Sequence, residues 1–315
     1  MHVTSSASGR LTRNNRIKAS PSDLLFNSVN MLLTLLVTAV MAYPLYFILI
    51  ASFSDPFKVY NGTVTWLPQG FTLEAYVNIL RYDIIWTGYR NTIFYTVFGT
   101  FYNLALTIPA AFVLSRRQLP LHTPISWFFF ITMYFGGGLI PTYMLYDQLG
   151  LLNSPLAMVL GTGVSCYNLI VSRQYFSSSI PDELQDAARI DGASDIRFFF
   201  RIALPLAAPI IAVMGLYYSV GHWNSYFSAL IYLTNSRLFP LQLVLRNILI
   251  LNQNAMANMS YDDDLELVAS AARQAYMANS MKYALILVAS APLLGLYPFI
   301  QKYFVKGVMI GSVKG

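Results

Sequence analysis

Long stretches without a charged side chain dominate this sequence and limit what it can fold into. They contain 31, 25, 29, 25, 35 and 19 residues, the first between Asp23 and Asp55 and the last between Lys282 and Lys302. A helix that crosses a bilayer needs about 20 predominantly apolar residues. The stretches therefore predict an all-α membrane protein with six transmembrane helices. The predicted spans are 25–53, 91–114, 124–146, 155–174, 205–231 and 281–301.

The composition excludes the main soluble alternatives. Only 11% of the residues are charged and 56% are hydrophobic, whereas soluble domains carry roughly 25% charged residues. Because so few charged residues cannot cover a soluble surface, a soluble enzyme, a nucleic-acid-binding protein and a disordered chain are excluded. The net charge of +6 does not indicate nucleic-acid binding, because the charged residues lie between apolar stretches and not on one polar face. A single cysteine, Cys166, allows no disulfide within the chain, and no Cys/His cluster predicts a metal site.

The basic residues predict the orientation. With six spans, both termini lie on the same side, and that side holds 13 of the 20 Lys and Arg residues. The positive-inside rule makes it the cytoplasmic side. The predicted organisation is a basic cytoplasmic N-terminus at 1–23, a transmembrane domain at 24–301 and a cytoplasmic tail at 302–315. A cleaved signal peptide is disfavoured, because the first apolar run continues to Phe53, beyond a signal's 7–15 apolar residues.

Two spans carry helix-breaking residues. Gly136-Gly137-Gly138 followed by Pro141 interrupts the third span. The 35-residue stretch after Arg201 has room for two short helices, and the charge rule does not decide between one and two. Because it contains no polar turn cluster, we expect one long helix entered through Pro205.

One connection has a helix–turn–helix pattern, and we call residues 179–204 the elbow. Pro181 and the two acids after it favour a helix start, and Gly192 favours a helix stop. Ser194 begins a second, Phe-rich helix that runs to Leu204. Small residues at the tip suit the close approach of another protein. An amphipathic elbow lying in lipid headgroups fits the same residues.

The elbow also resembles a known motif. Asp186-Ala187-Ala188-Arg189-Ile190-Asp191-Gly192, nine residues and then Ile202-Ala203-Leu204-Pro205 are similar to the EAA motif of ABC importer permeases, E-A-A-x-x-x-G, nine residues, I-x-L-P. Asp186 stands where Glu is usual. Three further segments resemble the carbohydrate class of this family, of the maltose-importer and complex-polysaccharide kinds. These segments are 135–143, Trp223-Asn224 and 301–315.

The resemblance implies a type I ABC importer permease fold in the bacterial plasma (inner) membrane. It implies a second homologous permease chain, a dimeric cytoplasmic ATPase that docks on the elbow, and an extracytoplasmic sugar-binding protein that delivers an oligosaccharide. The chain contains no phosphate-binding loop, so no cofactor is expected in it, and ATP and Mg are expected in the ATPase. The implied coupling residues are Glu183, Asp186, Ala187, Ala188, Asp191, Gly192, Ile202, Leu204 and Pro205.

A sugar is neutral and rich in hydroxyls, so aromatic rings and amides suit its pathway. The candidates in the fifth span are Tyr217, Trp223, Asn224 and Phe227, of which Trp223 and Phe227 share one helical face. Packing against the second permease explains the same residues.

Two rival functions remain open. An ABC permease for a non-sugar solute would have the same elbow. An ion-coupled secondary transporter usually needs ionisable residues inside its spans. The charge-free stretches hold no Asp, Glu, Lys or Arg, and we interpret His222 as a structural hydrogen-bonding residue. The acidic run at 262–264 suits either a helix start or the docking of a binding protein.

Overall fold

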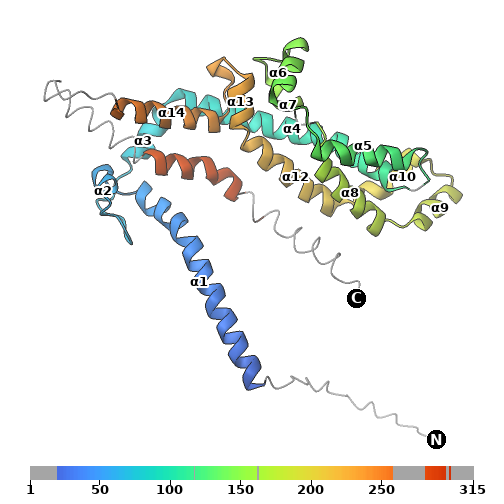
Figure 1. Ribbon diagram of the computed structural model, residues 1–315, viewed down its shortest axis with the longest axis horizontal. Coiled ribbons are helices and arrows are strands. Elements are labelled where there is room, and N and C mark those ends of the chain that lie inside the picture. The colour runs from blue at the N-terminus through green and yellow to red at the C-terminus, as the bar shows by residue number, and fades with distance from the viewer. Residues whose placement is uncertain (1–19, 117, 162, 258–280, 296–297, 299–315) are drawn as a thin grey trace, which may run out of the picture. The chain divides into compact units, whose positions relative to one another are not determined.

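The computed structural model describes residues 20–116, 118–161, 163–257, 281–295 and 298 (Figure 1). These residues form helices joined by turns and contain no strand, which confirms the predicted all-α class. The chain divides into two compact units, Met1–Ile48 and Leu49–Gly315. The helices are α1 (Pro21–Ser52), α2 (Pro56–Tyr60), α3 (Glu74–Arg81), α4 (Asp83–Ser115), α5 (His122–Tyr134), α6 (Leu139–Gln148), α7 (Pro155–Leu160), α8 (Cys166–Ser179), α9 (Asp182–Ile190), α10 (Asp195–Phe198), η1 (Phe199–Ala203), α11 (Leu204–Leu206), α12 (Ala208–Trp223), α13 (Tyr226–Tyr232), η2 (Ser236–Leu238) and α14 (Leu241–Ala257).

Helix α1 supplies nearly all the described residues of the first unit. It is long and apolar enough to cross a membrane. Its Thr34 and Thr38 hydroxyls donate to the carbonyl oxygens four residues earlier, at 2.8 and 2.7 Å. These polar side chains are thus satisfied inside the helix, as a lipid environment requires.

The second unit is organised around α4, which is also long and apolar enough to span. Helices α12 and α8 pack most extensively against α4, and α14 and α7 pack against it as well (Figure 1). Toward the end of α4 nearer the elbow, Phe112, Phe176, Phe198 and Met214 share one buried cluster. A second buried cluster joins α3, α4, α14 and the helix Met281–Gly295.

The third predicted span is a broken pair. Helices α5 and α6 meet at an angle of 112° across residues 135–138. Gly138 has φ +85°, which an L-residue rarely adopts, so the predicted interruption is confirmed. The fourth predicted span is also divided, into α7 and α8.

The fifth predicted span is not the single long helix that we expected. The segment Asp195–Leu206 meets α12 at 77°, and α12 ends at Trp223. The end of α12 at Trp223 follows from side chains that compete with the backbone: Asn224 Nδ2 donates to the Val220 carbonyl at 3.0 Å, and Ser225 Oγ donates to the His222 carbonyl at 2.7 Å. Asn224 and Ser225 therefore supply turn chemistry after Gly221, in a stretch where we expect no turn.

Two chains of hydrogen bonds connect α4, α12 and the α7–α8 connection inside the unit. His222 Nε2 donates to Asn103 Oδ1 at 2.7 Å, and Asn103 Nδ2 donates to the Gly163 carbonyl at 2.6 Å. The Tyr218 hydroxyl bonds Thr107 Oγ1 at 2.7 Å and accepts from the Ser165 N–H at 3.1 Å. Because buried polar groups are costly when unpaired, these bonds fix where α8 begins.

Two described helices, or up to four if each bent pair is one span, are long and apolar enough to cross a membrane. The described apolar helices Leu241–Ile250 and Met281–Gly295 are shorter. The N-terminus, the acidic run at 262–264 and the tail at 302–315 lie outside the described residues. The count of six spans and the side on which the termini lie therefore stay predictions.

Candidate functional site: the elbow

The predicted helix–turn–helix of the elbow is confirmed. Pro181 is the N-cap of α9, with ψ 154°, and two acids occupy its first turn. The helix closes on Gly192, whose φ is +79°. The N–H of the next residue, Ala193, then returns to the Ala188 carbonyl at 2.9 Å. This is a glycine-dependent helix stop, because an L-residue at positive φ is strained.

The second helix of the elbow begins as the sequence indicates and then changes its winding. Ser194 Oγ accepts from the Arg197 N–H at 3.3 Å and caps α10. The next turn, η1, is a π-helix that ends just before Leu204-Pro205. Proline lacks an N–H to continue the α-helical ladder, so a wider turn before it accommodates the missing bond.

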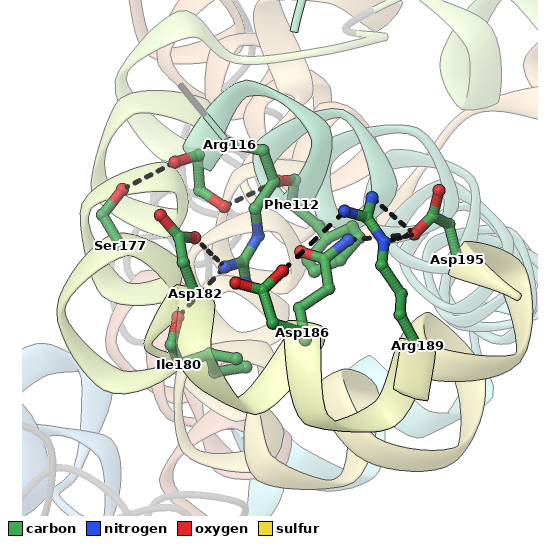
Figure 2. A network of polar contacts seen from close by, with 10 residues as sticks. Phe112, Arg116, Ser177, Ile180, Asp182, Asp186, Arg189 and Asp195 are labelled. Atoms are coloured by element: carbon green, nitrogen blue, oxygen red, sulfur yellow. Dashed lines mark hydrogen bonds and ion pairs between the residues drawn. The ribbon is translucent and has the colours of Figure 1, made fainter. Parts of the chain in front are cut away.

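An arginine at the end of α4 ties the elbow to the spans (Figure 2). Arg116 Nη1 lies 2.7 Å from Asp182 Oδ1 and donates to the Ile180 carbonyl at 3.2 Å. Its guanidinium also lies over the ring of Phe112, 4.9 Å from the ring centroid. One side chain therefore joins the last turn of α4 to the first turn of α9.

A second arginine braces α9 against α10 (Figure 2). Arg189 Nη2 lies 3.1 Å from Asp195 Oδ1, and Gln185 Nε2 donates to the same oxygen at 3.0 Å. Arg189 Nη1 also lies 3.9 Å from Asp186. The Gln185 amide, and then Arg189, hold the pKa of the Asp195 carboxyl below its usual range.

A cavity of about 270 Å³ is lined by both arginines. Arg116 Nε and Nη2 are buried beside it without a hydrogen-bond partner among the described residues. Three aspartates and Gln185 line the same cavity, so it offers both donors and acceptors at the elbow.

The three small tip residues do not all face outward. Ala187 and Gly192 are exposed, but Ala188 is only 7% exposed and belongs to the buried cluster that contains Phe112 and Phe198. We had expected the small size of Ala188 to admit a partner. Instead it lets α9 lie close to the chain's own core.

The elbow exposes three large apolar side chains. Ile190 is 87% exposed, Ile196 72% and Phe200 62%. Glu183, Asp186 and Asp191 of the elbow are exposed as well. Large exposed apolar side chains on a charged segment are typical of a surface that another molecule covers.

The second half of the motif faces the interior. Ile202 and Leu204 pack partly buried against the cluster around Phe112, whereas Pro205 is exposed. The motif thus divides into an outer part, on α9 and the turn, and an inner part that joins the elbow to α12.

The four pathway candidates do not form one face. Trp223 is buried, and its Nε1 donates to the Ala289 carbonyl at 3.1 Å. Phe227 lies beyond the break that ends α12, so the two rings do not share a helical face as predicted. Tyr217, Asn224 and Phe227 are exposed, and their place on a substrate pathway stays a prediction.

Sequence reasoning missed Arg116 and Asn103. Nothing local in the sequence marks the bonds of Arg116 to Ile180 and Asp182, which are 64 and 66 positions away. Asn103 had a signal, because an amide inside an apolar stretch needs a buried partner. Among the described residues, no group of three His, Cys, Asp or Glu side chains suits a metal ion.

Comparisons with known proteins assign the chain to a family. The polygalacturonan/rhamnogalacturonan transport system permease protein YtcP of Bacillus subtilis is 38% identical over 86% of this chain and 92% of its own length. Protein LplC of the same organism is 36% identical over 92% of this chain and 95% of its own length.

A solved structure agrees with these relatives. A chain from the crystal structure of a bacterial ABC transporter involved in the import of the acidic polysaccharide alginate matches with TM-score 0.80 and 31% identity. The match covers 91% of this chain and 99% of that one. The family model described as "Binding-protein-dependent transport system inner membrane component" matches residues 84–310. The chain therefore belongs to this family of ABC permeases, as a transport component of the inner membrane.

Proposed function

We propose that the chain is one of two homologous permease subunits of an ATP-driven importer of oligosaccharides. A dimeric cytoplasmic ATPase, which holds ATP and Mg, drives it through the elbow, and an extracytoplasmic sugar-binding protein delivers the substrate. The observation that carries the proposal is the form of the elbow: an EAA-type motif that exposes both apolar and acidic side chains and is braced by Arg116 and Arg189.

The two parts of the motif have different roles in this proposal. Glu183, Asp186, Ala187, Asp191 and Gly192 lie on the exposed part and contact the ATPase. The inner residues carry the resulting movement to α12, because a packed element moves as a body. These inner residues are Ala188, Ile202 and Leu204, and Pro205, which is exposed, follows them in α11.

The relatives narrow the proposed substrate to fragments of an acidic polysaccharide. One relative is named for polygalacturonan and rhamnogalacturonan, and the structural neighbour for alginate. Oligogalacturonides are therefore the first substrates to test. Tyr217, Asn224 and Phe227 are the exposed pathway candidates, and buried Trp223 ties the end of α12 to the Ala289 carbonyl.

Affinity purification of the gently solubilised chain, followed by mass spectrometry, tests the assembly. We expect a P-loop ATPase and a second permease chain to be recovered with it. A Gly192→Arg variant is the matched control, and it should retain the second permease but lose the ATPase. Recovery of the wild-type chain alone in mild detergents would count against the proposal and favour a self-contained transporter.

The ion-coupled alternative has its own test at His222. Its Nε2 is already bonded to an amide oxygen of Asn103, which suits a structural role. A His222→Gln variant keeps a donor at this position, so uptake should persist. Loss of uptake with normal expression would revive the alternative.

A further inference from the structure

Two adjoining cavities lie near the N-terminal end of α5 and the C-terminal half of α8. One, of about 410 Å³, is mainly polar, and the other, of about 420 Å³, is mainly apolar. They share three lining residues, His122, Arg173 and Gln174. The pair thus forms one amphipathic site with basic and amide side chains at the junction.

The junction is suited to an anion. Arg173 Nη1 donates to Ser126 Oγ at 3.2 Å. This bond positions the Arg173 side chain, which lines both cavities. His122 Nε2 donates to the Leu114 carbonyl at 3.0 Å. His122 also opens α5, whose N-cap, Leu121, makes no side-chain capping bond. The positive end of the α5 dipole therefore adds to the charge of Arg173.

One carboxylate faces the polar cavity and has to be weighed. Asp182 lines it but is paired with Arg116 at 2.7 Å. The pairing neutralises most of its repulsion toward a bound anion. The hydroxyl-bearing residues Ser115, Ser177 and Ser178 make up the rest of the polar wall.

The other cavity is suited to hydrocarbon. Trp127, Phe130 and Ile170 line it, and Trp127 is 57% exposed. The rings of Trp127 and Phe130 meet edge to face, with centroids 5.6 Å apart. Ile125 and Phe129 of α5 pack against the cluster around Phe112, whereas Trp127 and Phe130 stay exposed among the described residues.

We propose that this site binds an anionic phospholipid. The phosphate lies against Arg173, Gln174 and the start of α5, and an acyl chain follows Trp127 and Phe130. Basic pockets at the membrane ends of helices are known to take anionic headgroups. The apolar cavity assigns the site to a lipid and not to free phosphate, because a free anion gains nothing from it.

Native mass spectrometry of the purified complex tests this site, with added phosphatidylglycerol or phosphatidylcholine as the probe. We expect phosphatidylglycerol adducts to exceed phosphatidylcholine adducts on the wild type. Arg173→Gln should lower phosphatidylglycerol affinity about fivefold, the loss for one basic contact, with phosphatidylcholine unchanged. Arg173→Lys should retain most of the binding. Arg90→Gln removes an exposed arginine that lines neither cavity and should change nothing.

A second variant separates a lipid from a free anion. Trp127→Ala, at an exposed position, should weaken long-chain phosphatidylglycerol but not water-soluble glycerol phosphate. Equal phosphatidylglycerol binding by wild type and Arg173→Gln would overturn the proposal. The proposal would also be overturned if glycerol phosphate competed for the site as strongly as the lipid does. Adducts on the isolated chain that vanish in the assembled complex would show that the second permease covers the site instead.

Discussion

Gly192 allows the docking role of the elbow to be separated from its folding. Its φ of +79° strains any L-residue, by about 1–2 kcal/mol. A Cβ built on Gly192 meets nothing within 4 Å, so steric overlap adds no further cost. Gly192→Ala and Gly192→Arg therefore carry the same backbone strain. Part of it is offset because both variants restrict the unfolded chain, which leaves a net loss of about 1 kcal/mol for each.

The two variants differ only in what the exposed tip presents to a partner. An unpaired guanidinium buried in a protein interface costs about 3–5 kcal/mol, which is more than a hundredfold in affinity. We therefore expect Gly192→Ala to retain ATP-coupled uptake and Gly192→Arg to lose it.

The assay measures uptake and ATP hydrolysis side by side in proteoliposomes that contain the whole complex. Thermal unfolding of both variants checks that their stabilities match. Equal uptake by the two variants would refute the reasoning, because the tip would then not be a contact surface. Equal loss of uptake by both variants would show that backbone strain at Gly192, and not the side chain presented to the partner, causes the loss.

Three further predictions concern how the elbow is held. Arg116→Met should lower the free energy of local unfolding of α9 by about 1–3 kcal/mol, because it leaves the buried Ile180 carbonyl unpaired. Amide hydrogen exchange in α9 should therefore become faster, and unchanged exchange would show that Arg116 does not hold α9 in place. Ala188→Leu should lower the unfolding free energy by about 1–3 kcal/mol, because the buried site has no room for the larger side chain. Ala187→Leu, at an exposed position, should have an unfolding free energy within about 0.5 kcal/mol of the wild type. Thermal unfolding measures both. Asp195 has a lowered pKa in the fold, so its contribution to stability is present above its unfolded pKa and lost as the pH falls through the folded value. Asp195→Asn should therefore make the unfolding free energy less sensitive to acid. If the variant and the wild type lose unfolding free energy equally as the pH falls, Asp195 does not make this contribution.

The backbone of the elbow could be predicted from the sequence because its signals are local. Pro181, Gly192 and Ser194 act on φ, ψ and the nearest N–H groups, and the structure uses each one at the expected place. The interruption of the third span was local for the same reason, since Gly138 takes a positive φ.

The tertiary features could not be predicted in this way. The bond of Arg116 to Asp182 joins residues 66 positions apart, and no periodicity encodes it. The inward placement of Ala188 depends on which face of α9 meets the Phe112 cluster, and a short helix with small residues does not determine that face. The end of α12 depended on two side-chain bonds, from Asn224 and Ser225, and these two adjacent polar residues are too weak a signal to predict a break.

ATP-driven uptake by the reconstituted complex tests the central claim most directly. Proteoliposomes would hold the chain with its co-purified ATPase and second permease, and would receive the binding protein and labelled oligogalacturonides outside. The account predicts accumulation that requires ATP inside the vesicles, persists when ionophores collapse ion gradients, and disappears with Gly192→Arg. Accumulation that stops with ionophores, or that proceeds without ATP, would contradict it.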